Sequence, residues 1–194
     1  MVHDMSQPSS KTSALTIAAV VVAGVILYVV TGGPDGPSDA DAVKKPSGAV
    51  EMTVSSVRPD GTFRGKIERS GRYADEGLQR IGTYDRVTLR LADVEPPQPV
   101  RDPCWIEEGQ KAVKDLIGAR IWIDPQDVQQ QGSGTFTVYA WNRKGTFVQE
   151  QLLRDGDGKA FAGRLSVRYR DSLTSAEDEA AAAERGLWGA CGTA

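Results

Sequence analysis

Apolar and polar residues alternate along three stretches in the middle of the chain. The alternation covers Val50–Val57 and Thr62–Ile67, with the turn sequence Arg58-Pro59-Asp60-Gly61 between them. A period of two is typical of a half-buried strand, and this turn composition suits a hairpin, so the pattern predicts a β-hairpin. Arg86–Leu91 alternates in the same way and predicts a third strand, which a proline-rich loop follows.

Helical and strand patterns succeed each other in the rest of the chain. Apolar positions at helical spacing run from Ile106 to a stop near Gly118, and they predict a helix. Short alternating segments at residues 120–124 and 135–141 predict two more strands, and residues 146–153 and 173–185 predict two more helices. Three strands, a helix, two strands and two helices predict an α+β domain, a five-stranded OB-fold-like barrel with three helices.

The N-terminal quarter has a different pattern. Residues 14–30 are 17 uncharged, mostly apolar residues after a polar tail, 1–13, and before a Gly/Pro/Ser/Asp-rich flexible linker, 31–48. We expect one transmembrane helix ahead of a domain at 49–194, because the run is long for a signal peptide and the cleavage-like Ala40-Asp41-Ala42 lies far beyond it. The expected localisation is the membrane, single-pass, with the C-terminal domain extracytoplasmic.

Composition narrows the chemistry. The net charge is −3, so no global field attracts a polyanion. The single histidine, His3, lies in the polar tail, which leaves no Ser-His-Asp or Cys-His pair. Two cysteines cannot form a structural zinc site. Catalysis would therefore depend on carboxylates, arginines, tyrosines or a hard metal ion.

Two C-terminal segments resemble a known family. The segment "GTFVQEQLLRDGDGKAF" after the fifth predicted strand and the closing "AEDEAAAAERGLWG" are similar to the staphylococcal-nuclease-like (thermonuclease) domain. The resemblance covers roughly residues 50–189. It implies a calcium-dependent phosphodiesterase site: aspartates hold the metal ion, a glutamate is the general base, and two arginines stabilise the phosphoryl charge.

The residues at those positions depart from the family's pattern. Arg90 retains one phosphate-binding arginine, whereas Asp60 stands in a turn that has lost one of its two aspartates. Glu95 replaces the second metal-binding aspartate, so Asp60 and Glu95 are weak metal candidates. Gln98 occupies the position of the general base, and an amide cannot accept the proton. Thr135 occupies the position of the second arginine.

These losses predict a degenerate site. Loss of the general base alone costs a factor of roughly 10² to 10⁴. We therefore expect a membrane-anchored pseudoenzyme that binds or scaffolds nucleic acid, a saccharide or a protein, and that needs no cofactor. The alternative is an active calcium-dependent nuclease with a rearranged site.

Two further features are open at this level. Arg168, Tyr169 and Arg170 form a basic and aromatic stretch that is a candidate for nucleic acid binding, with Tyr169 stacking on a base. The alternative is a solvated loop whose charge Asp171 balances.

Cys104 and Cys191 are the two cysteines of the chain. In an oxidising compartment we expect them to form a disulfide, which would close a long loop. The alternative is two unrelated thiols, one of them buried and one in a frayed tail.

Overall fold

The computed structural model describes residues 42–68, 76–79, 81, 85–131, 134–161 and 166–192. The expected N-terminal tail, the expected anchor at 14–30 and most of the expected linker lie outside these ranges. Among the helices in the described ranges, none combines the length and the apolar character needed to cross a bilayer.

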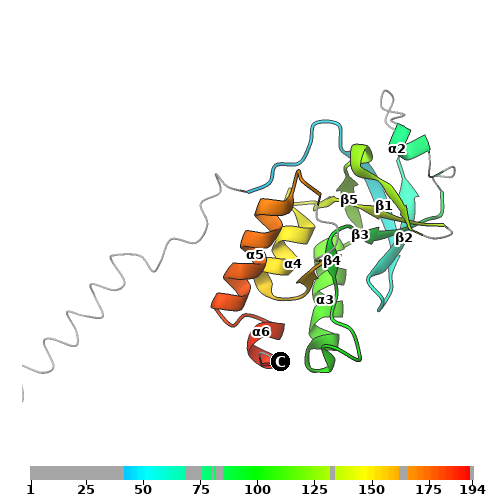
Figure 1. Cartoon of the computed structure of the whole chain (residues 1–194). Coiled ribbons are helices and arrows are strands. Elements are labelled where there is room, and N and C mark those ends of the chain that lie inside the picture. Colours follow the sequence, from blue (N-terminus) through cyan, green and yellow to red (C-terminus); the bar gives the residue numbers. More distant parts are fainter. Residues whose placement is uncertain are drawn as a thin grey trace, which may run out of the picture. The chain divides into compact units, whose positions relative to one another are not determined.

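The strands form a closed barrel and a small accessory sheet (Figure 1). The strands are β1 Val50–Val57, β2 Thr62–Ile67, β3 Val87–Leu91, β4 Val94–Glu95, β5 Arg120–Ile123, β6 Gln129–Gln131, β7 Thr135–Val138, β8 Ala140–Asn142 and β9 Lys159–Ala160. The larger sheet has the order β6-β7-β3-β2-β1-β5-β8. Only Tyr139 separates β7 from β8, so one segment pairs with β3 at one end and with β5 at the other and closes the barrel.

The inner face of the barrel follows from the alternation in the sequence. Met52, Phe63, Leu89 and Ile121 come from four different strands, and none of them is exposed to solvent. The β1–β2 turn ends at Gly61, whose φ of +76° favours glycine. The predicted hairpin has the observed bounds, and the α+β, OB-like part of the fold prediction is confirmed. The larger sheet holds seven strands where five were predicted.

A buried side chain completes the closure between β7 and β8. Gln149 is not exposed to solvent. Its Nε2 donates to the carbonyl oxygen of Val138 at 2.8 Å, and its Oε1 accepts from the amide of Ala140 at 3.2 Å. The side-chain amide thus adds hydrogen bonds to main-chain groups on both sides of Tyr139, where the segment passes from β7 to β8.

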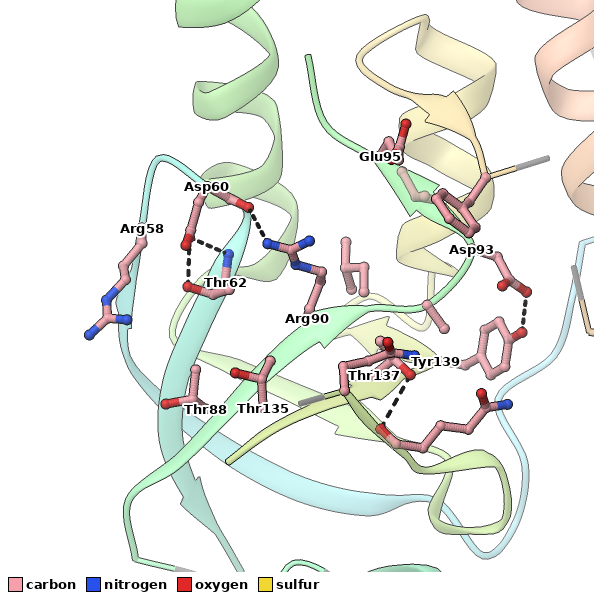
Figure 2. A pocket seen from close by; sticks show the side chains of 16 residues that line it. Arg58, Asp60, Thr62, Thr88, Arg90, Asp93, Glu95, Thr135, Thr137 and Tyr139 are labelled. Atoms are coloured by element: carbon pink, nitrogen blue, oxygen red, sulfur yellow. Dashed lines mark hydrogen bonds between the residues drawn. The ribbon is translucent and has the colours of Figure 1, made fainter. Parts of the chain in front are cut away.

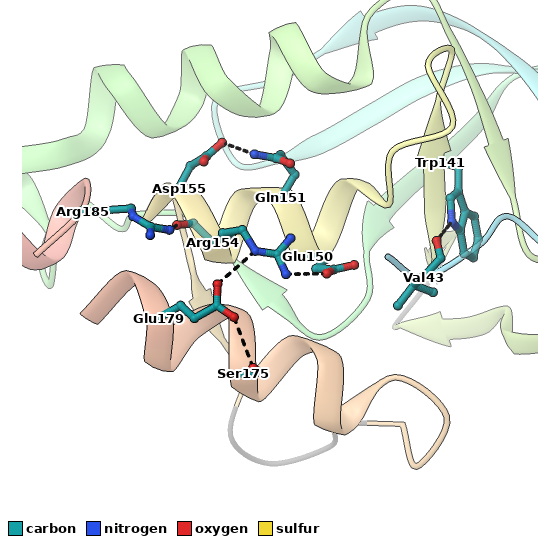
Figure 3. A network of polar contacts seen from close by, with 9 residues as sticks. All are labelled: Val43, Trp141, Glu150, Gln151, Arg154, Asp155, Ser175, Glu179 and Arg185. Carbon is teal, nitrogen blue, oxygen red and sulfur yellow. Dashed lines mark hydrogen bonds and ion pairs between the residues drawn. The ribbon is translucent and has the colours of Figure 1, made fainter. Parts of the chain in front are cut away.

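Three long helices gather at one end of the barrel (Figure 1). The described α-helices are α2 Glu76–Gln79, α3 Ile106–Ile117, α4 Val148–Asp155, α5 Arg170–Ala182 and α6 Leu187–Ala190, and the three long ones are α3, α4 and α5. Figure 3 shows Arg154 of α4 between two carboxylates: Nη2 lies 2.6 Å from Glu150 Oε1 on the same helix, and Nε lies 3.2 Å from Glu179 Oε2 on α5. This ion-pair network joins α4 to α5.

Some elements differ from the sequence-based expectation. The segment between the strands predicted at 120–124 and 135–141 contains β6, and the proline-rich loop contains β4, which pairs with β9. Both strands are too short to show a period, and "QQQ" has no alternation. The last predicted helix begins three residues earlier, at Arg170, because its first turn is polar.

The chain contacts the barrel before the first strand. Trp141 Nε1 donates to the carbonyl oxygen of Val43 at 3.0 Å, as Figure 3 shows. Lys45 Nζ lies 5.3 Å from the centre of the Trp122 ring. The compact unit accordingly begins at Ala42, so the end of the segment expected to be a flexible linker packs on the domain.

Candidate functional site

A cavity of about 570 Å³ opens where the β1–β2 turn meets the ends of β3 and β7 (Figure 2). It is lined by polar side chains from five strands and by a few apolar ones. The lining residues are Arg58, Asp60, Thr62, Thr88, Arg90, Leu91, Ala92, Asp93, Val94, Glu95, Gln129, Gln131, Thr135, Thr137, Tyr139 and Phe161. Four predicted site residues, Asp60, Arg90, Glu95 and Thr135, thus share one cavity.

Asp60 shapes the turn. Its Oδ1 accepts from the amide of Thr62 at 2.9 Å and from the Thr62 hydroxyl at 2.6 Å. Burial acts to raise the pKa of Asp60, but these hydrogen bonds and the charges of Arg90 and Arg58 outweigh it and lower the pKa. The carboxylate is therefore ionised at neutral pH, and one of its oxygens is occupied by the turn.

Arg90 extends from the end of β3 into the cavity. Its Nη2 donates to the carbonyl oxygen of Asp60 at 3.4 Å, and Figure 2 shows the guanidinium next to the turn. Arg58 lies on the other side of that turn. Two guanidinium groups thus flank the same part of the cavity, and such groups suit an anionic ligand.

The other two carboxylates of the cavity also have partners. Glu95 Oε2 lies 2.8 Å from Arg101 Nη2. Asp93 Oδ2 accepts from the hydroxyl of Tyr139 and from the amide of Ser166, the latter at 2.9 Å. Burial and the hydrogen bond to Asp93 raise the pKa of Tyr139, so its hydroxyl stays protonated and keeps donating.

This donor set does not fit calcium. Calcium takes six to eight oxygen ligands, several of them carboxylates. Among the described residues, no group of three or more Asp, Glu, His or Cys side chains is placed to hold a metal ion. Asp60 and Glu95, the two expected candidates, are engaged by Thr62 and Arg101.

Of the two positions that have lost a catalytic group, one lines the cavity and the other does not. Thr135 lines the cavity from β7, whereas Gln98 does not. Gln98 Nε2 donates to the carbonyl oxygen of Pro96 at 2.9 Å, and the main-chain amide of Gln98 donates to Asp102 Oδ2 at 3.2 Å. The side chain at the expected position of the general base therefore folds back on its own loop.

The proline-rich loop is held by close packing. A Cβ at Gly61 would lie 2.8 Å from Pro96 Cγ, and a Cβ at Gly109 of α3 would lie 2.5 Å from Pro97 Cγ. Each proline thus fits against a glycine that no other residue can replace without a shift. Through these two prolines, the loop packs between the β1–β2 turn and α3.

Within the basic and aromatic stretch, Tyr169 lies in the interior, whereas Arg168 and Arg170 are exposed. Tyr169 is 3% exposed, packs on Tyr139, and donates its hydroxyl to Asp124 Oδ2 at 3.0 Å. Arg168 Nη1 lies 2.7 Å from the same buried carboxylate. Arg170 is exposed at the start of α5. The expectation that Tyr169 stacks on a base is wrong, because its ring fills the space between the barrel and α5.

Cys104 and Cys191 form a disulfide, with Cα atoms 5.6 Å apart. The bridge joins the segment just before α3 to the residue after α6. Lys159 of β9 adds a second tie nearby, because its Nζ lies 2.6 Å from Asp102 Oδ1. The segment that follows the proline-rich loop is therefore fixed to both β9 and the chain end.

A closed OB-like barrel, helices at one end and a cavity at the β1–β2 turn define a nuclease-type domain. The family model for staphylococcal nuclease homologues matches residues 88–190, which is more than half of the chain. The chain belongs to this family. No curated protein matches it.

Several cavity residues carry no motif. Arg58 lies in a turn that the family pattern reads through its aspartates, and only the folding of that turn brings it to the cavity that Arg90 also lines. Asp93 and Arg101 lie before and after the motif positions 95–98. The sequence does not show that Asp93 pairs with Tyr139 or that Arg101 pairs with Glu95. The glutamines of β6 belong to a strand that the sequence does not predict.

Proposed function

We propose that this domain binds an anionic ligand in the Arg90 cavity and does not hydrolyse it. The observation that carries the proposal is the state of the carboxylates. Asp60, Asp93 and Glu95 are each engaged by a neighbour, and the residue at the position of the general base lies outside the cavity. The cavity keeps cationic groups for an anion. The carboxylate beside them, Asp60, has a lowered pKa and one oxygen held by Thr62, so it is a poor acceptor for a proton from water.

The absence of the second arginine supports the same function. Thr135 supplies a hydroxyl at that position, which can donate a hydrogen bond to a bound ligand but offers no charge. Transition-state stabilisation in phosphodiester hydrolysis depends on cations around the phosphoryl oxygens. Arg58 and Arg90 can hold an anion in the ground state.

We also propose that the chain is anchored by residues 14–30 with the domain in an oxidising, extracytoplasmic compartment. The support is the apolar run itself and the disulfide between Cys104 and Cys191, since disulfides persist in oxidising compartments. A reporter fused after Ala194 tests the orientation. Activity of a reporter that works only in the cytoplasm would reverse it.

The test of the binding function has two arms on the full chain. A fluorescence-quenched oligonucleotide in millimolar calcium measures cleavage, and we expect none that depends on Arg90. Nitrogen-15 NMR of the arginine Nε groups, with galacturonate monomer as the probe, measures binding. We expect the Arg90 signal to shift and the effect to vanish in Arg90→Ala, while Arg143→Ala, an exposed arginine in the turn after β8, leaves it unchanged. Cleavage that Arg90→Ala abolishes would show an active nuclease.

A further inference from the structure

The strand register aligns polar side chains in two rows on the outward face of the barrel. Inward positions such as Phe63 and Leu89 are buried, so their neighbours in the chain point outward. The first row crosses five strands as Ser56, Arg64, Thr88, Thr135 and Gln131. The second row crosses them as Arg58, Thr62, Arg90, Thr137 and Gln129.

Neither row contains a carboxylate or an aromatic ring. Each row presents arginine, hydroxyl and amide groups. All members of the two rows line the Arg90 cavity except Ser56 and Arg64, and the carboxylates of Asp60, Asp93 and Glu95 line that cavity as well. Arg86, two residues before Thr88 on the same side of β3, adds a further guanidinium. It lines a second cavity together with Ser55, Ser56 and Arg64. We call the two rows and Arg86 the outward polar face.

The arginines of this face form no close ion pair with the carboxylates that the structure describes, although the charges of Arg58 and Arg90 lower the pKa of Asp60. Arg58, Arg64, Arg86 and Arg90 have no ion pair with any carboxylate in the described part of the chain. Arginines elsewhere do, for example Arg101 with Glu95 and Arg154 with Glu150. Arg64 Nε donates to Thr88 Oγ1 at 3.1 Å, which orients its guanidinium between the two cavities.

The spacing of these charges calls for an extended ligand. Arg86 directly precedes β3 and lies four residues before Arg90, which corresponds to about 13 Å along an extended chain. A single small anion cannot contact both. A linear ligand with several anionic groups can run from the Arg90 cavity across β3 and β2 to the second cavity.

The side chains favour a sugar chain over a nucleic acid. Single-stranded nucleic acids gain much of their affinity from bases stacked on exposed aromatic rings. Of the aromatic residues that line the two cavities, Tyr139 is 2% exposed and Phe161, at the rim, is 42% exposed. Asp60 lines the first cavity and Asp85 lines the second, so the face is not uniformly cationic. Hydroxyl and amide groups match the hydroxyls of sugars.

We propose that the outward polar face binds a linear acidic polysaccharide, a chain of uronic acid residues, across β1, β2, β3, β7 and β6. The inference rests on the proposed binding function of the Arg90 cavity and extends it. Arginines hold the carboxylates, and threonine, serine and glutamine side chains hold the hydroxyls between them. Strands two and three of OB-folds are an established surface for oligosaccharides.

The experiment compares an oligogalacturonate with an oligodeoxythymidylate of equal length, by titration calorimetry on the full chain at physiological ionic strength. We expect tighter binding of the oligogalacturonate. Arg64→Ala and Arg86→Ala should each weaken it roughly tenfold, the value of one hydrogen bond to a charged group. Arg143→Ala should leave it unchanged, and unchanged melting temperatures show that the variants fold.

The outcomes separate this inference from the function on which it rests. Tighter binding of the oligodeoxythymidylate overturns it in favour of nucleic acid. Unchanged affinity in both Arg64→Ala and Arg86→Ala also overturns it, while binding of galacturonate monomer that is lost in Arg90→Ala still supports the cavity function. If Arg90→Ala binds the monomer and the oligomer as the wild type does, both the inference and the proposed function of the cavity are overturned.

Discussion

Replacing both Cys104 and Cys191 by serine removes the bridge between the start of α3 and the chain end. The bridged residues are 87 positions apart. In the chain-entropy model, a closed loop of that size restricts the unfolded chain and stabilises the fold by about 4.6 kcal/mol at 25 °C. For a domain of this size, that corresponds to a fall in melting temperature of roughly 9–18 °C.

The local structure reduces this value slightly. Leu187 is the buried residue of α6, and Gly189 and Ala190 after it are exposed, so the last residues can move in the variant. That freedom stabilises the folded state of the variant and offsets part of the loss. We expect a decrease of about 3–4.6 kcal/mol in the free energy of unfolding.

The assay is urea unfolding of the full chain, followed by tryptophan fluorescence and extrapolated to water. The wild type is measured with and without reductant, and the double serine variant in both conditions is the control, because reductant should not affect it. A loss below about 1 kcal/mol with an unchanged m-value would refute the reasoning, since the bridge would then restrict the unfolded chain far less than its loop length implies.

Three further predictions concern the site and its supports. Gln98→Glu with Thr135→Arg should still give no cleavage of a quenched oligonucleotide in calcium, because residue 98 lies outside the cavity; an Arg90-dependent rate would contradict this geometry. Arg154→Ala should lower the free energy of unfolding by about 2–4 kcal/mol, because it leaves the buried Glu150 unpaired, and Glu179→Ala should cost less than about 1 kcal/mol in the same urea titration. Burial acts to raise the pKa of Asp102, but hydrogen bonds from Lys159 and the amide of Gln98 outweigh it and lower the pKa, so this carboxylate contributes stability above about pH 4 that is lost as the pH falls through its folded pKa. Lys159→Met should reduce that loss between neutral and acid pH in urea titrations, and an unchanged pH dependence would show that Lys159 does not set the pKa.

The barrel could be predicted because each long strand carries its own period. The alternation at residues 50–57 and 62–67 and the turn chemistry between them suffice for the hairpin, whose observed bounds are the same. The short strands β4, β6 and β9 could not be predicted, since pairing with distant residues decides them and two or three residues show no period.

The candidate site was predictable in part. The motif spacing places Arg90, Asp60, Glu95 and Thr135 in one cavity. Their partners lie elsewhere in the chain: Asp93 meets Tyr139 and Ser166 only after the barrel and α5 have assembled. Tyr169 failed as a surface prediction for a related reason. Its neighbours Arg168 and Arg170 are exposed and charged, and the sequence does not show that a buried Asp124 receives its hydroxyl.

The amide of Gln149 has a consequence for how ligand preference can change over generations. The Gln149 side chain bonds to the main chain of Val138 and Ala140 and does not line the cavity that Thr135 and Thr137 line. The main chain that carries Thr135 and Thr137 therefore keeps its position when those two side chains change. Substitutions there can alter which groups a ligand meets without disturbing the barrel closure. Glutamate at position 149 would lose the hydrogen-bond donor to the Val138 carbonyl. Substitution at positions 135 and 137 therefore depends on glutamine being kept at position 149.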